Sequence, residues 1–222
     1  MSSSRKVVFC DFDGTVAKRD VGYNLFRHFS GERNRELVDD WMAGRISSRD
    51  ILTRQAEMVH ASPEEIFEFL DKFELDGTFA DFHHLCQANG VELIIVSEGL
   101  EFYIRRLLDR EGLAYTKVIS NIGVLKQNRL FVEFPYSNRT CQRCGSCKGE
   151  RIAEYRQAVG GSCAVAFVGD GYSDACAAGE ADILFAKKDL LQYCQSKNIA
   201  YNEFEDFRDV AGRLAELGFL VA

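Results

Sequence analysis

Two aspartates directly follow the first strongly apolar run of the chain. The stretch "VVFC" at residues 7–10 leads into Asp11 and Asp13, and Gly14 then turns the chain. Burying a carboxylate costs free energy unless a cation or hydrogen-bond donors meet it. Two carboxylates at the end of a predicted buried strand therefore indicate the edge of an active site rather than part of a core.

Two later apolar runs also end in residues that can carry chemistry. "VELIIVS" ends at Ser97, and "AVAFVGD" opens the sequence "GDGYSD", which contains Asp170 and Asp174. In an open parallel sheet, ligands bind at the carboxyl ends of the strands. Carboxylates that converge there repel one another unless a cation lies between them, and hard oxygen ligands of this kind suit Mg²⁺.

A phosphate group fits the same edge of the sheet. Lys148 opens the predicted helix "GERIAEYRQAVGG" and is the best-placed basic residue. A helix N-terminus adds partial positive charge and free N–H groups, which favour phosphate. The net charge of -7 argues against broad nucleic-acid binding, which needs a basic surface. We therefore expect a small phosphorylated metabolite as the partner, and no nucleic acid.

Strands and helices alternate around these residues. Nearly continuous apolar runs fit a parallel sheet that is covered on both faces, and they occur at residues 6–12, 91–97, 164–170, 183–186 and 199–204. Amphipathic stretches that close with Gly lie between them, at 78–90 and 100–112. This alternation predicts a doubly wound α/β domain.

Residues 17–76 interrupt this alternation. They contain no strong strand pattern and three helix candidates, at about 22–43, 48–60 and 63–73. The stretch "SPEE" is a helix start with Ser62 as the cap and Pro63 in the first turn. A helical insert after the first strand predicts a small cap domain, 17–76, on a catalytic core formed by residues 1–16 and 77–222.

The order of these motifs resembles the haloacid dehalogenase (HAD) superfamily of phosphohydrolases, in its phosphoserine-phosphatase-like subgroup. "DFDGT" matches the first motif, Ser97 the second, Lys148 the third and "GDGYSD" the fourth, across the whole chain. The resemblance implies a HAD-like doubly wound parallel sheet, or Rossmannoid core, with a small helical cap inserted after the first strand. It also implies a phosphomonoester hydrolase that uses Mg²⁺ and an aspartyl-phosphate intermediate.

The resemblance further implies a role for each matched residue. Asp11 attacks phosphorus, while Asp13 protonates the leaving oxygen and then activates water. The metal ligands are Asp11, the backbone carbonyl of Asp13, and Asp170. The phosphoryl oxygens are bound by Ser97, Gly99, Lys148 and the N–H of Gly14, and Asp174 orients Lys148 or a water at the metal. General acid–base catalysis alone accelerates a reaction by about 10²–10⁴-fold. A covalent route and charge neutralisation must therefore supply the remaining rate acceleration that hydrolysis of a phosphate ester needs.

Further stretches narrow the substrate by resemblance. "GRISSRD", "IIVSEGLEF" and "FPYSNRTCQRCGSCK" resemble phosphatases of 2-hydroxy-3-keto-5-methylthiopentenyl-1-phosphate in methionine salvage. The cysteine-rich stretch also resembles phosphoethanolamine/phosphocholine phosphatases. Phosphoserine is a weaker alternative, because Asp20 matches the acid those phosphatases use but Gln55 stands in place of their cap arginine. Glu98, where many relatives carry a small residue, is expected to point away from the phosphate.

Other interpretations of the same residues stay open. A lone D-x-D after a strand can be a helix cap plus a surface carboxylate, and "GDGYSD" can be a turn. A non-catalytic phosphometabolite-binding module is the second hypothesis, and phosphoryl transfer to an acceptor other than water is the third. The cap offers Arg45, Arg49 and Arg54 for an anionic or polar substrate tail.

The chain has eight cysteines, and three of them lie close together in "CQRCGSCK". Cys141, Cys144 and Cys147 have zinc-like spacing, but a structural zinc site needs four ligands. A fourth ligand from elsewhere would complete such a site. The alternative is a loop with free thiols, or with an adventitious disulfide, that positions Lys148. We interpret the other five cysteines as small buried hydrophobes.

No apolar run approaches the roughly 18 residues that a membrane helix needs. The apolar stretch before Asp11 is also too short for a signal peptide. We therefore expect a cytoplasmic protein with no membrane partner. The sequence does not determine its oligomeric state.

Overall fold

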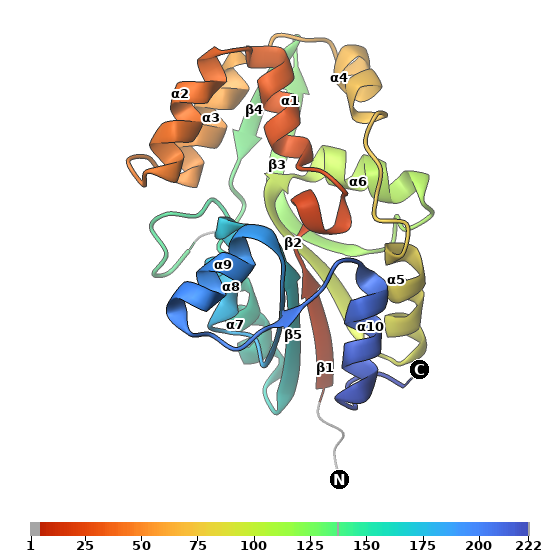
Figure 1. Ribbon diagram of the computed structural model, residues 1–222. Helices are drawn as coiled ribbons and strands as arrows, with labels where there is room; N and C mark the ends of the chain where they lie inside the picture. The colour runs from red at the N-terminus through yellow and green to blue at the C-terminus, as the bar shows by residue number, and fades with distance from the viewer. Residues whose placement is uncertain (1–4, 137, 222) are drawn as a thin grey trace.

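The computed structural model describes residues 5–136 and 138–221. Its centre is a seven-stranded sheet with the order β4-β3-β2-β1-β5-β6-β7 (Figure 1). All neighbouring strands in it are parallel except β3 and β4. This architecture confirms the predicted HAD-like α/β fold.

The five predicted strands are all present. Their bounds are β1 (Arg5–Cys10), β2 (Glu92–Leu100), β5 (Cys163–Gly169), β6 (Ile183–Ala186) and β7 (Asn202–Glu203). The structure adds β3 (Lys117–Lys126) and β4 (Arg129–Glu133), which the apolar pattern did not predict. Both are largely half-buried or exposed along their length, so they lack the continuous apolar run of the central strands.

Helices cover both faces of the sheet. Their bounds are α5 (Phe79–Ala88), α6 (Glu101–Arg110), α7 (Lys148–Val159), α8 (Ala175–Ala178), α9 (Lys188–Lys197) and α10 (Phe207–Glu216). Helices α7, α8 and α9 lie on one face of the sheet, and α5, α6 and α10 lie on the other (Figure 1). The buried side chains of each set belong to a separate apolar cluster. The central strands are therefore buried on both faces, as their continuous apolar runs require.

Four further helices lie together beyond the carboxyl ends of the strands (Figure 1). They are α1 (Val21–Ser30), α2 (Arg33–Met42), α3 (Ser48–Met58) and α4 (Pro63–Leu70). The single helix predicted at 22–43 is wrong, because the chain turns at Gly31 and starts a second helix. The predicted helix start with Ser62 as the cap is confirmed. The domain boundaries 1–16 with 77–222 and 17–76 stay a prediction.

The strand register sets the position of the site. Cys10, the last residue of β1, lies opposite Ile95 of β2 and Val168 of β5. The residues that follow each strand therefore leave the sheet at one edge, side by side. This edge faces the four helices of the insert, so a site there lies between sheet and cap.

Candidate active site

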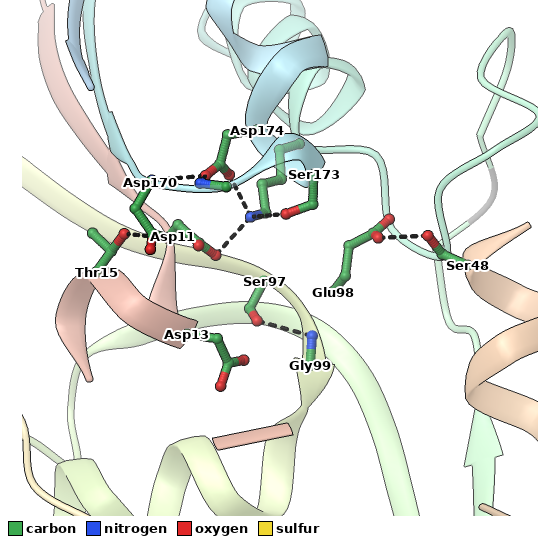
Figure 2. Close-up of polar contacts among 12 residues, drawn as sticks. Asp11, Asp13, Thr15, Ser48, Ser97, Glu98, Gly99, Asp170, Ser173 and Asp174 are labelled. Atoms are coloured by element: carbon green, nitrogen blue, oxygen red, sulfur yellow. Dashed lines mark hydrogen bonds and ion pairs between the residues drawn. The ribbon is translucent and has the colours of Figure 1, made fainter. Parts of the chain in front are cut away.

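Lys148 lies at the centre of a buried ionic cluster. It is the first residue of α7 and only 1% exposed. Its Nζ donates to Asp11 Oδ1 at 2.6 Å, to an oxygen of Asp174, and to Ser173 Oγ at 3.2 Å. Figure 2 shows the side chains of Asp11 and Asp174, and both form ion pairs with this ammonium group. Three segments far apart in sequence thus meet through one lysine.

Asp170 joins the cluster from the end of β5. Its Oδ1 accepts from Thr15 Oγ1 at 3.1 Å, and its Oδ2 accepts from Lys188 Nζ at 2.8 Å. One carboxylate oxygen from each of Asp11, Asp170 and Asp174 lies within 4.8 Å of the others. Oxygens on opposite sides of a Mg²⁺ ion are about 4.2 Å apart, because each Mg–O distance is about 2.1 Å. The spacing and the donor type therefore fit one magnesium ion.

The pKa values explain why this cluster needs a further positive charge. Burial and the neighbouring charge of Asp174 raise the pKa of Asp11 well above its usual range, although Lys148 opposes the shift. Burial works against the charge of Lys148, but Asp11 and Asp174 outweigh it and raise the pKa of the lysine. The lysine therefore stays charged, while the carboxylates still lack full compensation in the protein alone.

Gly14 permits the close approach of Asp170. It has a φ of 77°, and a Cβ at this position would lie 2.4 Å from Asp170 Oδ2. No side chain fits between the first motif and the fourth. The glycine that ends the "DFDG" run therefore has a steric reason to be there.

Asp13 faces the beginning of α1 instead of the lysine. Its Oδ1 accepts from the backbone N–H groups of Val21, at 2.7 Å, and Gly22, at 3.1 Å. Its Oδ2 accepts from the hydroxyl of Tyr103 at 2.8 Å. Burial raises the pKa of Asp13, while the hydrogen bonds from Tyr103, Gly22 and Val21 oppose the shift. A raised pKa favours a carboxyl group that holds a proton for donation near neutral pH.

The end of β2 contributes Ser97, Glu98 and Gly99 to the same edge. Ser97 is 1% exposed, and its Oγ accepts from the Gly99 N–H at 2.9 Å. Glu98 points away from the carboxylate cluster toward Ser48, as expected (Figure 2). Its Oε2 accepts from Ser48 Oγ at 2.7 Å, and its Oε1 accepts from the Gly145 N–H at 2.9 Å. Glu98 therefore connects the core to the cap.

A cavity of about 310 Å³ lies above this floor. Six matched residues line it, whereas Asp174 does not and instead pairs with Lys148: Asp11, Asp13, Gly14, Ser97, Lys148 and Asp170. The wall on the cap side is mainly apolar: Phe26, Val38, Trp41, Met42, Ile51 and Leu52. The three cap arginines do not line it; Arg45 pairs with Asp40, and Arg49 donates to the carbonyl of Tyr136.

The motifs missed two residues of the site. Lys188 lies two residues after the end of β6, so the strand-end argument that found Asp170 could have found it as well. Tyr103 carries no comparable signal, because it lies 90 residues from Asp13 within an ordinary amphipathic helix. The residues next to Asp13 in the sequence give no indication that Tyr103 is its partner.

Comparisons with known proteins agree with this geometry. The family model for haloacid dehalogenase-like hydrolases matches residues 8–179. The chain belongs to this family. It is 34% identical to Pdp3-interacting factor 1 of Schizosaccharomyces pombe, over 96% of each chain. It is 29% identical to the 2-hydroxy-3-keto-5-methylthiopentenyl-1-phosphate phosphatase of Geobacillus kaustophilus, over 97% of this chain and 98% of that protein.

A solved structure has a fold similar to that of this chain. The phospho-aspartyl intermediate analogue of a phosphoserine phosphatase has a TM-score of 0.70 with this chain at 18% identity, and the match covers 95% and 99% of the two chains. The chain therefore shares the fold of a phosphoserine phosphatase, which agrees with its membership of the haloacid dehalogenase-like hydrolases. None of the helices in the described ranges has the length and apolar character that crossing a bilayer requires.

Proposed function

We propose that this phosphatase hydrolyses a small phosphomonoester with Mg²⁺, through an aspartyl-phosphate on Asp11. The observation that carries the proposal is the buried contact between Lys148 and Asp11, with Asp170 and Asp174 beside it at the floor of the cavity. A structural ion pair would need no third carboxylate and no open cavity above it. A buried cluster with excess negative charge fits a site that gains a cation when it works.

Asp11 acts as the nucleophile in this proposal. A carboxylate oxygen bonds to phosphorus, and the bond from phosphorus to the leaving oxygen breaks. Lys148 and Ser97 bind the phosphoryl oxygens, and the Gly14 N–H adds a further donor. Asp174 holds Lys148 in place, because its other oxygen is fixed by the N–H groups of Asp170 and Gly171, each at 3.0 Å.

Asp13 moves the proton. Its raised pKa lets it give a proton to the leaving oxygen and then take one from the water that hydrolyses the aspartyl-phosphate. Its contacts with Val21 and Gly22 couple this carboxylate to the first cap helix. Cap position and proton transfer are therefore linked through α1.

Asp11, Asp170 and the backbone carbonyl of Asp13 would hold Mg²⁺. The bound ion supplies the charge neutralisation that lets an anionic nucleophile approach an anionic phosphate. Lys188, which binds Asp170 Oδ2 in the protein alone, would exchange part of this contact for the ion.

The apolar wall of the cap supports a substrate with an apolar tail. Trp41 and Met42 line the cavity opposite the carboxylate floor, and thioether groups pack well against such side chains. We infer that 2-hydroxy-3-keto-5-methylthiopentenyl-1-phosphate is the substrate. The names of several relatives at 27–29% identity support this choice.

Phosphoethanolamine or phosphocholine is the second candidate. Asp20 and Glu98 add carboxylates to the same cavity, and Tyr23 and Trp41 add aromatic rings. Such a combination binds ammonium groups through charge and cation–π contacts. Phosphoserine has weaker support, because no arginine of residues 5–136 and 138–221 lines the cavity to bind its carboxylate.

A panel of phosphate esters tests the proposal. Phosphate release is measured with Mg²⁺ for the methylthiopentenyl ester, phosphocholine, phosphoethanolamine, phosphoserine and an aryl phosphate. We expect the enzyme to hydrolyse the methylthiopentenyl ester, and we expect both chelator and Asp11→Asn to abolish this hydrolysis. Calorimetric binding without release of phosphate would identify a binding module instead, and transfer of the phosphoryl group to an added alcohol would identify a phosphotransferase.

A further inference from the structure

Four cysteine side chains meet outside the carboxylate cluster. Cys141, Cys144 and Cys147 lie on the loop before α7, and Cys176 lies in the first turn of α8. Their four Sγ atoms all lie within 4.8 Å of one another. Cys176 is therefore not an isolated buried hydrophobe, as the sequence suggested, but the missing fourth member of the group.

We propose that these four cysteines bind a structural Zn²⁺ ion. Tetrahedral zinc with Zn–S distances of about 2.3 Å places its sulfur ligands about 3.8 Å apart, which the cluster accommodates. Thiolates are soft ligands, so they favour zinc over the Mg²⁺ that suits the carboxylates. Four protein ligands leave no open position, so this ion would be structural and not catalytic.

The loop that carries three of these cysteines is already organised for such a site. The Cys144 N–H donates to Cys141 Sγ at 3.5 Å. The Asn138 side chain accepts from the Cys147 N–H at 3.0 Å and donates to the Cys144 carbonyl at 2.7 Å. Residues without regular secondary structure are thus held by polar contacts with their thiols directed to one point.

The position of the cluster gives the ion a purpose. Cys147 immediately precedes Lys148, and Cys176 follows Asp174 by two residues. The start of α7 also packs directly against α8, since a Cβ on Gly149 would clash with the Cys176 carbonyl oxygen. An ion held by the loop before α7 and by the first turn of α8 would cross-link the start of α7 to the segment after β5. It would therefore stabilise the pairing of Lys148 with Asp174.

Metal content tests the proposal. The full-length protein is produced with zinc in the medium and dialysed into buffer with excess Mg²⁺, and bound metals are counted by mass spectrometry. We expect about one zinc per chain. Cys147→Ser and Cys176→Ser should lower the zinc content at least tenfold. Cys163→Ser is the matched control, because Cys163 lies on β5 outside the cluster, and it should keep its zinc.

Cobalt gives a readout that does not depend on hydrolysis. Wild-type apoprotein titrated with Co²⁺ should develop the absorption of tetrahedral thiolate-bound cobalt, with an end point at about one ion per chain. This titration also decides the case if the serine variants fail to fold. Three results would each overturn the proposal: wild-type protein that has no zinc and does not develop this absorption, stoichiometric iron in place of zinc, or an unchanged zinc content in folded Cys176→Ser. None of these outcomes depends on which ester the enzyme cleaves.

Discussion

Substitution of Gly14 by alanine should damage the site in a way that the structure specifies. The new Cβ would lie 2.4 Å from Asp170 Oδ2, whereas ordinary contacts begin at 3.4 Å. The Asp170 carboxylate must therefore move by about 1 Å, and a misplacement of this size can lower the rate about 10²-fold. Because the φ of Gly14 is positive, alanine there also strains the folded backbone and lowers the free energy of unfolding by about 1–3 kcal/mol.

A matched control separates the two effects. Gly160 also has a positive φ, of 60°, but no atom lies within 4 Å of the Cβ that alanine would add there. Steady-state phosphatase assays over a range of Mg²⁺ concentrations should show that only Gly14→Ala needs more Mg²⁺ for half-maximal activity and has about 10²-fold lower kcat/KM. Chemical denaturation should show similar losses of stability for both variants. Equal activity and equal Mg²⁺ response in the two would refute the placement of Asp170 at the metal.

Three further changes test other parts of the site. Lys148→Met should lower kcat/KM by about 10²–10³-fold, the effect of removing one donor to a developing charge. In chelator it should also lower the free energy of unfolding by about 3–5 kcal/mol on denaturation, because it leaves buried carboxylates unpaired, whereas Lys188→Met, which replaces a half-exposed lysine, should lower it far less. In chelator, burial and Asp174 raise the pKa of Asp11, so the folded protein binds more protons than the unfolded chain and loses stability as the pH rises above about 4. Asp11→Asn should remove that loss, and thermal melts that show the same pH slope for both proteins would contradict the pKa argument. Trp41→Ala should raise KM for the methylthiopentenyl ester about tenfold, because the substrate loses about 1–3 kcal/mol of apolar contact. Phosphoethanolamine turnover measured in parallel should reveal whether the same ring binds a cation.

The strand ends were predictable because their geometry is local. Asp11 and Asp170 each follow a continuous apolar run, and parallel strands in register must release their next residues at the same edge. The sequence therefore indicates which side chains meet even though 159 residues separate them in number. Gly14 belongs to the same local pattern, and the structure supplies only its steric reason.

Long-range partners without a repeated pattern were not predictable. Cys176 lies in a four-residue helix far from Cys147, and nothing in its neighbourhood distinguishes it from a buried cysteine. Strands β3 and β4 were missed because partial exposure of their faces removes the apolar signal. The orientation of the cap arginines was also not predictable, because the position of Arg45 in the sequence does not determine that its side chain turns toward Asp40.

Trapping of the phosphorylated enzyme tests the central claim most directly. Asp13→Asn protein is mixed with the ester and Mg²⁺, quenched in acid and digested, and the peptides are mapped by mass spectrometry. A covalent phosphoryl group on the peptide of residues 5–18, assigned to Asp11 and absent from Asp11→Asn, is the predicted result. Phosphate released in full turnover by Asp11→Asn, or a phosphoryl group on another residue, would contradict the account.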